Sequence, residues 1–281
     1  MRADAFLTLL HGAVVLVVLL GSIRLISENK HSVSVVFYAF GLASVLLSDL
    51  YWLAYELLRP GTRMPFAANE IGEWAMFLLA GACLTARRTS FYRSAGYELI
   101  GVGVFAAANV GLWIAWSGEW VQDILTGLAF GYALCCLVAR IRQEDAFAPR
   151  DWLIFGIACP VLIFLQVLIF FVPQQMKQPL DVCCYVLLFA GVAYLLGCAV
   201  HTMRENRSLR KETEEKTTDD SKTHRGKGEA GRELCRLFAV FSWVVITMYM
   251  SEGVYYIVAM LLSLFCYPMI LMALKKEVET A

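Results

Sequence analysis

Long uninterrupted apolar runs constrain this sequence more than any other feature. They are 17 to 25 residues long, and short clusters of charged and polar residues separate them. A helix of about 20 residues crosses roughly 30 Å of hydrocarbon. A helix also bonds its own backbone polar groups, which lipid cannot do, and the runs lack the alternation of barrel strands. The sequence therefore predicts an all-α, polytopic integral membrane helix bundle.

The composition agrees with a bilayer as the surrounding solvent. Hydrophobic residues make up 59% of the chain and charged residues only 17%, whereas about a quarter of the residues in soluble domains are charged. So few charges cannot cover the surface of a soluble fold of this size. The formal net charge is zero, so the total charge gives no reason to expect a nucleic-acid partner.

About nine transmembrane helices are predicted, seven in one bundle and two in a C-terminal hairpin. The eighth run is the shortest and turns back at 251–253, so the sequence leaves its complete crossing open. The predicted spans are 5–23, 33–57, 68–86, 95–116, 120–139, 152–172, 180–200, 234–250 and 254–274.

Lysine and arginine are concentrated in alternate connections between these runs. Basic residues are frequent at 24–30, 87–93, 140–150 and 202–233 and after the last run, and they are rare in the other connections. Because basic loops stay in the cytoplasm, the pattern predicts an N-terminus outside and a C-terminus in the cytoplasm. An odd number of helices agrees with this orientation. The expected location is the plasma (cytoplasmic) membrane of a bacterium, since no eukaryotic sorting feature is recognisable.

One long polar segment, 204–232, interrupts the apolar runs. It mixes both signs of charge and has no aromatic residue and no apolar periodicity, so it cannot bury a core of its own. We interpret it as a flexible cytoplasmic linker, with a docking site for a soluble cytoplasmic partner as the alternative. Its first part can also extend the seventh helix through i,i+4 pairs such as Arg210 with Glu214. The predicted parts are the seven-helix bundle 1–203, the linker 204–232, and the hairpin with its short tail 233–281.

Acidic residues gather at the predicted outer end of the helices. Asp49 and Glu56 lie in the second span, and Glu70 and Glu73 begin the third. Ionisable groups at membrane depth are costly and indicate functional sites by default. Asp49 lies too far inside its helix for simple capping, so its carboxyl group must be paired or protonated, which suits proton coupling. His11 in the first span is a candidate partner for it.

Aromatic side chains accompany these acids. Asp49, Trp52 and Glu56 share one helical face, and the short connection predicts that the second and third helices are antiparallel neighbours. Carboxylates neutralise a cation and aromatic faces attract it, a combination that suits organic amines. A hard metal ion would instead require roughly six or more oxygen ligands. The predicted ligand-binding residues are Asp49, Trp52, Tyr55, Glu56, Asn69, Glu70, Glu73 and Trp74, with Asp49 as the proton-coupling group.

The same residues also have a purely structural interpretation. Acids in the first turn stabilise a helix through its dipole, which accounts for Glu70 and Glu73. Arg59 and Arg63 lie between the two helices and can pair with the acids in a structural clamp. A lone histidine such as His11 is typical of a packing residue. The sequence leaves the functional and the structural interpretation open.

Catalytic and metal-binding motifs are not recognisable in the sequence. The four histidines are scattered, and the nine cysteines form no CxxC pair and lie mostly inside apolar runs, where a free thiol behaves as a small hydrophobe. We therefore expect no metal and no cofactor. Motifs of the GxSxG, HExxH, GxGxxG and P-loop types are missing. This argues against an enzyme, although an enzyme that acts on lipid through carboxylates stays open.

The most specific function that these features support is a small-solute transporter or permease for a cation or amine, with an outward-facing acidic and aromatic site. The expected partners are then the lipid bilayer and a small cationic solute. The alternative is a non-transporting membrane sensor or partner protein that acts through 204–232. Seven helices before a charged segment resemble, in helix count alone, the membrane-embedded sensing regions of bacterial signalling proteins.

Overall fold

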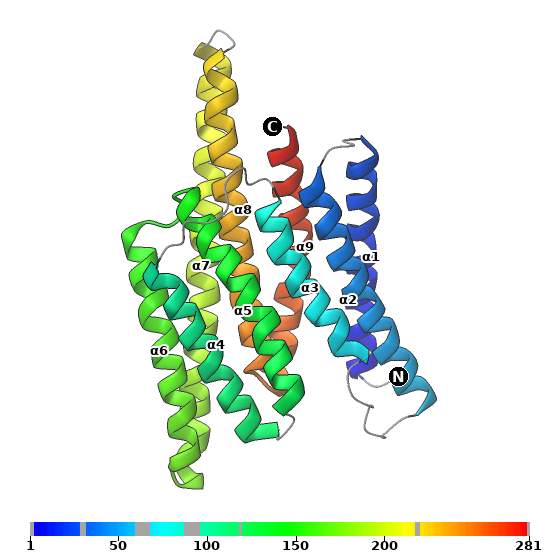
Figure 1. Ribbon diagram of the computed structural model, residues 1–281, viewed down its shortest axis with the longest axis vertical. Coiled ribbons are helices and arrows are strands. Elements are labelled where there is room, and N and C mark those ends of the chain that lie inside the picture. Colours follow the sequence, from blue (N-terminus) through cyan, green and yellow to red (C-terminus); the bar gives the residue numbers. More distant parts are fainter. Residues whose placement is uncertain are drawn as a thin grey trace. The chain divides into compact units, whose positions relative to one another are not determined.

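The computed structural model is all-helical. It describes residues 3–28, 32–59, 68–86, 96–117, 120–216 and 220–279, and it contains no strand within them. The helices in these residues, labelled in Figure 1, are α1 (Ala3–Glu28), α2 (Val33–Leu58), α3 (Ala68–Thr85), α4 (Gly96–Ser117), α5 (Trp120–Gln143), α6 (Pro149–Phe171), α7 (Gln174–Lys216), α8 (Asp220–Tyr249) and α9 (Gly253–Glu279).

Each helix covers one of the predicted apolar runs, which confirms the all-α fold class. Five of the described helices are long and apolar enough to cross a membrane, namely α1, α2, α5, α7 as far as Glu205, and α9. The protein is therefore compatible with a multi-pass membrane protein. Two other helices begin with charged residues, α3 with Glu70 in its first turn and α8 at Asp220. The count of about nine spans and their orientation stay predictions.

The described residues of the predicted linker are helical. α7 continues to Lys216 and α8 begins at Asp220, and Glu229 and Ala230 of α8 are buried. The structure thus has helix where the sequence predicts a flexible segment. The buried residues of α8 before Leu234 include the charged Glu229 and Glu233, so apolar periodicity could not reveal this part of the helix. The division at 203 and 232 stays a prediction.

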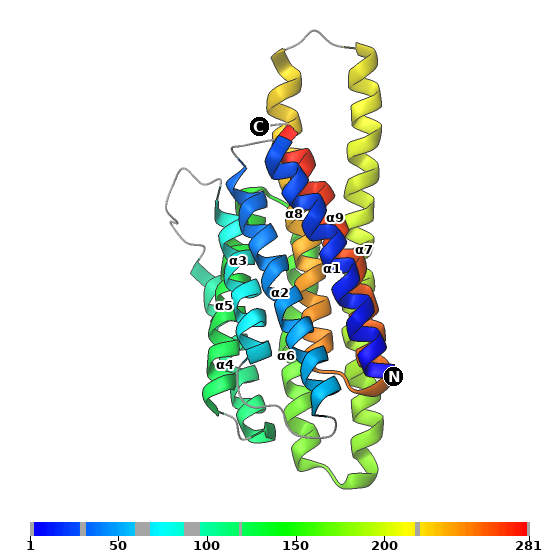
Figure 2. The same cartoon turned by 90° about the vertical axis from the view of Figure 1, so that its right-hand side faces the viewer.

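The chain forms two compact units, and their boundaries differ from those of the predicted bundle, linker and hairpin. Unit 1 comprises Met1–Ser94 and Trp113–Cys136, and unit 2 comprises Ala95–Leu112 and Leu137–Ala281. Within unit 1, α2 packs against both α1 and α3 (Figures 1 and 2). Within unit 2, α6 packs against α7, α7 against α8, and α8 against α9. Neighbours in sequence are therefore neighbours in space inside each unit.

Local sequence accounts for the turns between the helices of unit 2. Pro149 opens α6, where its fixed φ suits the first helical position and its missing N–H costs nothing. The backbone N–H of Ala148 before it donates to the Asp151 carboxylate at 2.8 Å. Gly253 opens α9 with a φ of +56°, a conformation that residues with a side chain rarely adopt. The polypeptide can therefore reverse between α8 and α9 in a short turn.

A buried tryptophan joins α7 to α8 in unit 2. Trp243 is 2% exposed, and its indole Nε1–H donates to the backbone oxygen of Leu188 at 2.9 Å. The ring lies directly against Gly191, where an added Cβ would overlap the indole. Glycine at this position therefore allows the two helices to approach closely enough for the hydrogen bond.

We predict that Gly191→Ala destabilises the protein by about 1–3 kcal/mol, because a methyl group there forces the Trp243 ring out of its place. Gly197→Ala is the matched control on α7, since a Cβ at Gly197 meets no atom within 4 Å. In this variant alanine adds up to about 1 kcal/mol of helix propensity. Thermal unfolding in detergent, followed by circular dichroism, measures both. An equal Tm for the two variants would contradict the prediction.

Candidate functional site

The predicted ligand-binding residues lie on two helices that pack together in unit 1. Asp49, Trp52, Tyr55 and Glu56 lie on α2, and Glu70, Glu73 and Trp74 lie on α3, all seven of them half-buried. Asn69 is also in α3, but its side chain lies outside the described residues, as do Arg63 and most of the connection between the helices. The packing of α2 on α3 confirms the neighbour relation that the short connection predicted.

Glycines on both neighbours bring their backbones close to the middle of α2. A Cβ added at Gly72 of α3 would lie 2.6 Å from the backbone oxygen of Ser44 and 2.8 Å from Cβ of Ser48. On α1, a Cβ added at Gly12 would lie 3.6 Å from Asp49 Oδ2. Three helices therefore meet at residues 44–49 of α2. Asp49 and Glu73 each follow directly after a residue of this contact.

His11 and Asp49 form the central polar contact of this region. The His11 Nδ1 atom lies 2.7 Å from Asp49 Oδ2, and the two side chains are 9% and 18% exposed. The contact joins α1 to α2 across 38 positions in the sequence. His11, which the sequence suggested as a partner for Asp49, is therefore in contact with it. Both residues lie within helices long and apolar enough to cross a membrane.

The 2.7 Å contact between His11 Nδ1 and Asp49 Oδ2 is compatible with three arrangements of the hydrogen atoms. When Asp49 is ionised it can only accept, so Nδ1 of His11 carries the hydrogen and donates. When Asp49 is protonated, its O–H can donate to an unprotonated Nδ1. A charged imidazolium with an ionised carboxylate is the third arrangement, and it is an ion pair. Loss of either side chain would leave its partner's polar group in a largely apolar interior, which is costly.

Trp74 is held by a contact that the sequence did not predict. Its indole Nε1–H donates to Thr126 Oγ1 of α5 at 2.8 Å, and Thr126 is buried. One turn further along α3, the Phe77 and Phe130 rings lie 5.1 Å apart. These contacts fix α3 to α5 inside unit 1. The hydrogen bond occupies the N–H edge of the Trp74 indole.

The other predicted residues are less closely tied to Asp49. Tyr55 stacks on Tyr51, with ring centres 6.4 Å apart along α2. Glu56 lies near the end of α2 and Glu70 in the first turn of α3, and each has a polar or electrostatic partner. The structure brings Asp49 together with His11 on one side and with the contact at Gly72 on the other. Convergence of all eight predicted residues on one ligand stays a prediction.

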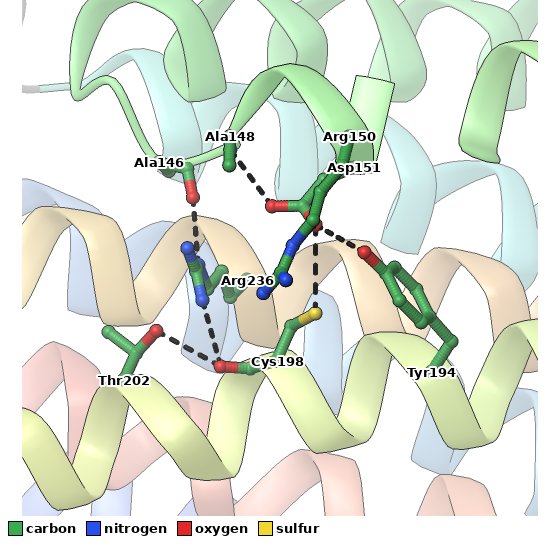
Figure 3. Close-up of polar contacts among 8 residues, drawn as sticks. All are labelled: Ala146, Ala148, Arg150, Asp151, Tyr194, Cys198, Thr202 and Arg236. Atoms are coloured by element: carbon green, nitrogen blue, oxygen red, sulfur yellow. Dashed lines mark hydrogen bonds and ion pairs between the residues drawn. The ribbon is translucent and has the colours of Figure 1, made fainter. Parts of the chain in front are cut away.

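A second polar cluster, in unit 2, was missed by the sequence interpretation. Figure 3 shows the buried Asp151 carboxylate at the start of α6 facing two residues of α7. Tyr194 donates its hydroxyl hydrogen to Asp151 Oδ1 at 2.5 Å, and the Cys198 thiol lies 3.9 Å from the same oxygen. The other oxygen accepts the backbone N–H of Ala148. Asp151 therefore ties α7 to the N-terminus of α6.

Arg236 of α8 completes this cluster by bonding to backbone carbonyls. Its Nε–H donates to the oxygen of Ala146 at 2.7 Å, and its Nη1–H donates to that of Cys198 at 2.9 Å. The Cys198 oxygen also accepts from the Thr202 hydroxyl at 3.0 Å. Protein groups thus use the hydrogen-bonding capacity of the cluster, so we interpret it as a structural junction of α6, α7 and α8. Its partners are distant in sequence, which left no local pattern to find.

Metal-binding geometry is missing from the part of the chain that the structure describes, where no three His, Cys, Asp or Glu side chains are placed to hold an ion. No family model, curated protein or solved structure matches the chain. Any functional assignment therefore depends on the chemistry of the sites. By that criterion the His11–Asp49 pair is the candidate functional site, because it is an ionisable pair inside two helices that can cross a membrane.

We predict that Gly72→Ala destabilises unit 1 by about 1–3 kcal/mol, because its methyl group collides with the α2 backbone at Ser44 and separates the helices. Gly12→Ala is the matched control, since its methyl group makes only ordinary contacts, 3.6–3.7 Å from Asp49 and Leu46. The measurement is the Tm of each variant in detergent. A Tm for Gly72→Ala equal to or above that of Gly12→Ala would show that the close α2–α3 contact is wrong.

Proposed function

We propose that the protein is a proton-coupled membrane carrier for a small cationic solute, such as an organic amine. The observation that carries this proposal is the buried His11–Asp49 pair, with 2.7 Å between Nδ1 and Oδ2. Each residue lies well inside a helix that is long and apolar enough to cross a membrane. Paired ionisable groups at this depth are characteristic of proton relays and substrate pathways.

Proton coupling follows from competition for one carboxylate. An ionised Asp49 attracts either a proton or a cation, and binding of one reduces the attraction for the other. His11 accepts a proton that leaves Asp49 and donates it back. The proton is therefore always bound to a side chain while it is inside the apolar interior. A carrier that exposes this pair first to one side and then to the other would exchange the cation for the proton.

The preference for an organic cation rests on the side chains that continue from Asp49 along α2 and α3. Trp52, Tyr55 and Trp74 offer aromatic faces, and Glu56, Glu70 and Glu73 offer negative charge. Aromatic faces attract weakly hydrated ammonium groups. The positive-inside pattern predicts that this end faces outward. An amine arriving from outside would then meet the acids before it reaches Asp49.

The experiment is ion exchange in proteoliposomes with tetraethylammonium as the probe, because its permanent charge prevents leakage as a neutral species. A pH-sensitive dye trapped inside records the proton movement that an imposed probe gradient drives. We predict that the wild type exchanges protons for the probe, and that Asp49→Asn and His11→Asn both abolish the exchange. The asparagine side chains keep a similar size but cannot share a proton in the same way.

Glu28→Gln is the matched control, because it neutralises an exposed carboxylate on α1, which pairs with the exposed Arg24 at 2.9 Å. Exposed pairs of this kind contribute little to stability. This variant should exchange at the wild-type rate, and all variants should keep the wild-type helix content. Exchange by Asp49→Asn at the wild-type rate, or no proton movement with the wild type, would sink the proposal.

A second candidate function is a membrane sensor or partner protein, and the length of α7 favours it. The part of this helix that can cross a membrane ends no later than Glu205, yet the helix continues to Lys216. A charged helix that extends beyond a membrane span suits contact with a soluble cytoplasmic partner. Deletion of 208–227 separates the two functions, because it spares the buried turn at Glu229. A carrier keeps its exchange activity after the deletion, whereas a partner protein loses its complex.

A further inference from the structure

Unit 2 contains a second set of buried charges, outside the site described above. Arg140 at the end of α5 donates through Nη2 to Glu277 Oε1 of α9 at 2.6 Å, and its Nε lies 2.9 Å from Glu144 Oε1. Lys276, the neighbour of Glu277, places Nζ 2.6 Å from Glu233 Oε2 of α8. We call these five residues the α9 latch. They bind the last turn of α9 to both α5 and α8.

The latch differs from ordinary surface ion pairs in its burial. The Arg140 and Glu277 side chains are 6% and 7% exposed, whereas those of the adjacent pair Lys275 and Glu279 are 58% and 51% exposed and 3.8 Å apart. Burial removes water from the charges, so losing one partner leaves the other without compensation. Hydrophobic residues of similar size often hold helices equally well or better. Packing strength alone therefore does not account for charges here.

A glycine in α8 makes room for the latch. A Cβ added at Gly231 would lie 2.5 Å from Glu144 Oε2 and 2.9 Å from Oε1. The Glu144 carboxylate therefore rests against the backbone of α8, where it also reaches Arg140. Cys235, one turn further along α8, is 0% exposed and lies within electrostatic range of Arg140. The thiol of Cys235 is consequently a natural reporter of whether this region is closed.

Pro268 lies inside α9, between its apolar first part and the latch. Proline has no N–H, so the carbonyl of Leu264 loses its helical hydrogen bond and the helix is weakened at that point. Prolines of this kind are the usual positions of helix kinks. Ile270 and Leu274, which follow Pro268, are fully buried, so a bend at this position would move them together with the latch. Cys266, which is also buried, lies before this position.

The latch also lies toward the end of α9, beyond the part of the helix that is needed to cross a membrane. At about 1.5 Å per residue, roughly 20 residues of a helix cross the hydrocarbon. The helix that is apolar enough to cross a membrane extends from Gly253 to Glu279, a length of 27 residues. Lys276 and Glu277 therefore come after the roughly 20 residues that suffice to cross.

We propose that the end of α9 after Pro268 is a hinged arm that the α9 latch holds closed against α5 and α8. Opening separates Glu277 from Arg140 and Lys276 from Glu233, and it exposes Cys235. Cys266, before the hinge, stays buried. This device is a property of unit 2 and does not depend on the proposed transport.

The test uses the native cysteines of the full chain in lipid nanodiscs. Brief treatment with N-ethylmaleimide is followed by mass spectrometry, which gives the labelling rate of each cysteine. In Glu277→Gln we expect labelling of Cys235 to rise by at least about tenfold, because the buried pair is broken. Labelling of Cys266 should not change. Cys83, which is 1% exposed in unit 1, should also keep its rate, which shows that the protein is still folded.

Three further variants distinguish a hinged latch from a static contact. Glu279→Gln removes a carboxylate two positions away on the exposed pair, and it should leave all three rates at the wild-type level. Glu277→Asp keeps the carboxylate that faces Arg140, and its Cys235 should be labelled more slowly than that of Glu277→Gln. Adding Pro268→Ala to Glu277→Gln should also slow this labelling, because a continuous helix cannot pivot there.

Two results would overturn the proposal. Unchanged labelling of Cys235 in Glu277→Gln would mean that the ion pair does not hold the arm. An equal rise at Cys235, Cys266 and Cys83 would mean that the pair is a structural bridge whose loss unfolds the protein. Glu233→Gln breaks the second pair of the latch independently. We expect it to speed the labelling of Cys235 as Glu277→Gln does, because both pairs hold the arm.

Discussion

The cost of leaving a polar group without a partner in an apolar interior is the constraint on which this structure depends. The backbone meets it by forming helices, and the buried side chains meet it by pairing. His11 with Asp49, Tyr194 with Asp151 and Arg140 with Glu277 all join two different helices. Each pair therefore fixes a helix position as well as neutralising a group. The same constraint identifies the His11–Asp49 pair as the candidate site. An ionisable pair inside helices that can cross a membrane is usually functional.

Glycine determines where these pairs can form. Hydrogen bonds between side chains on different helices need backbones that approach closely, and small residues allow this in the absence of a hydrophobic drive between helices. Gly72 admits the α2 backbone next to Asp49, Gly191 admits the Trp243 ring, and Gly231 admits the Glu144 carboxylate. Each of these three glycines lies beside a polar contact of its own unit. The close helix packing at these glycines is thus what brings the polar partners within hydrogen-bonding distance.

The sequence predicted what local pattern determines. The apolar runs predicted where each helix lies, but α7 continues to Lys216 and α8 begins at Asp220, both within the segment predicted as a linker. The depth of Asp49 in its run indicated its need for a partner, and His11 was the candidate. Contacts between distant residues had no such signal. Arg140 and Glu277 are 137 positions apart. The first part of α8 was predicted as a linker because its residues up to Arg232 are mostly polar, and the burial of Glu229 depends on tertiary packing. The number of spans and the convergence of the α2 and α3 acids also depend on tertiary arrangement, which no single run encodes.

The most direct test of the central claim is nitrogen-15 NMR of the protein in lipid nanodiscs with labelled histidines. The chain has four histidines, so the signals lost in a His11 variant identify those of His11. We predict that the His11 imidazole has one fixed hydrogen-bonded tautomer, and that Asp49→Asn shifts its Nδ1 signal while Glu28→Gln does not. A His11 signal that averages between tautomers, as in a solvent-exposed imidazole, and that ignores Asp49→Asn would contradict the account.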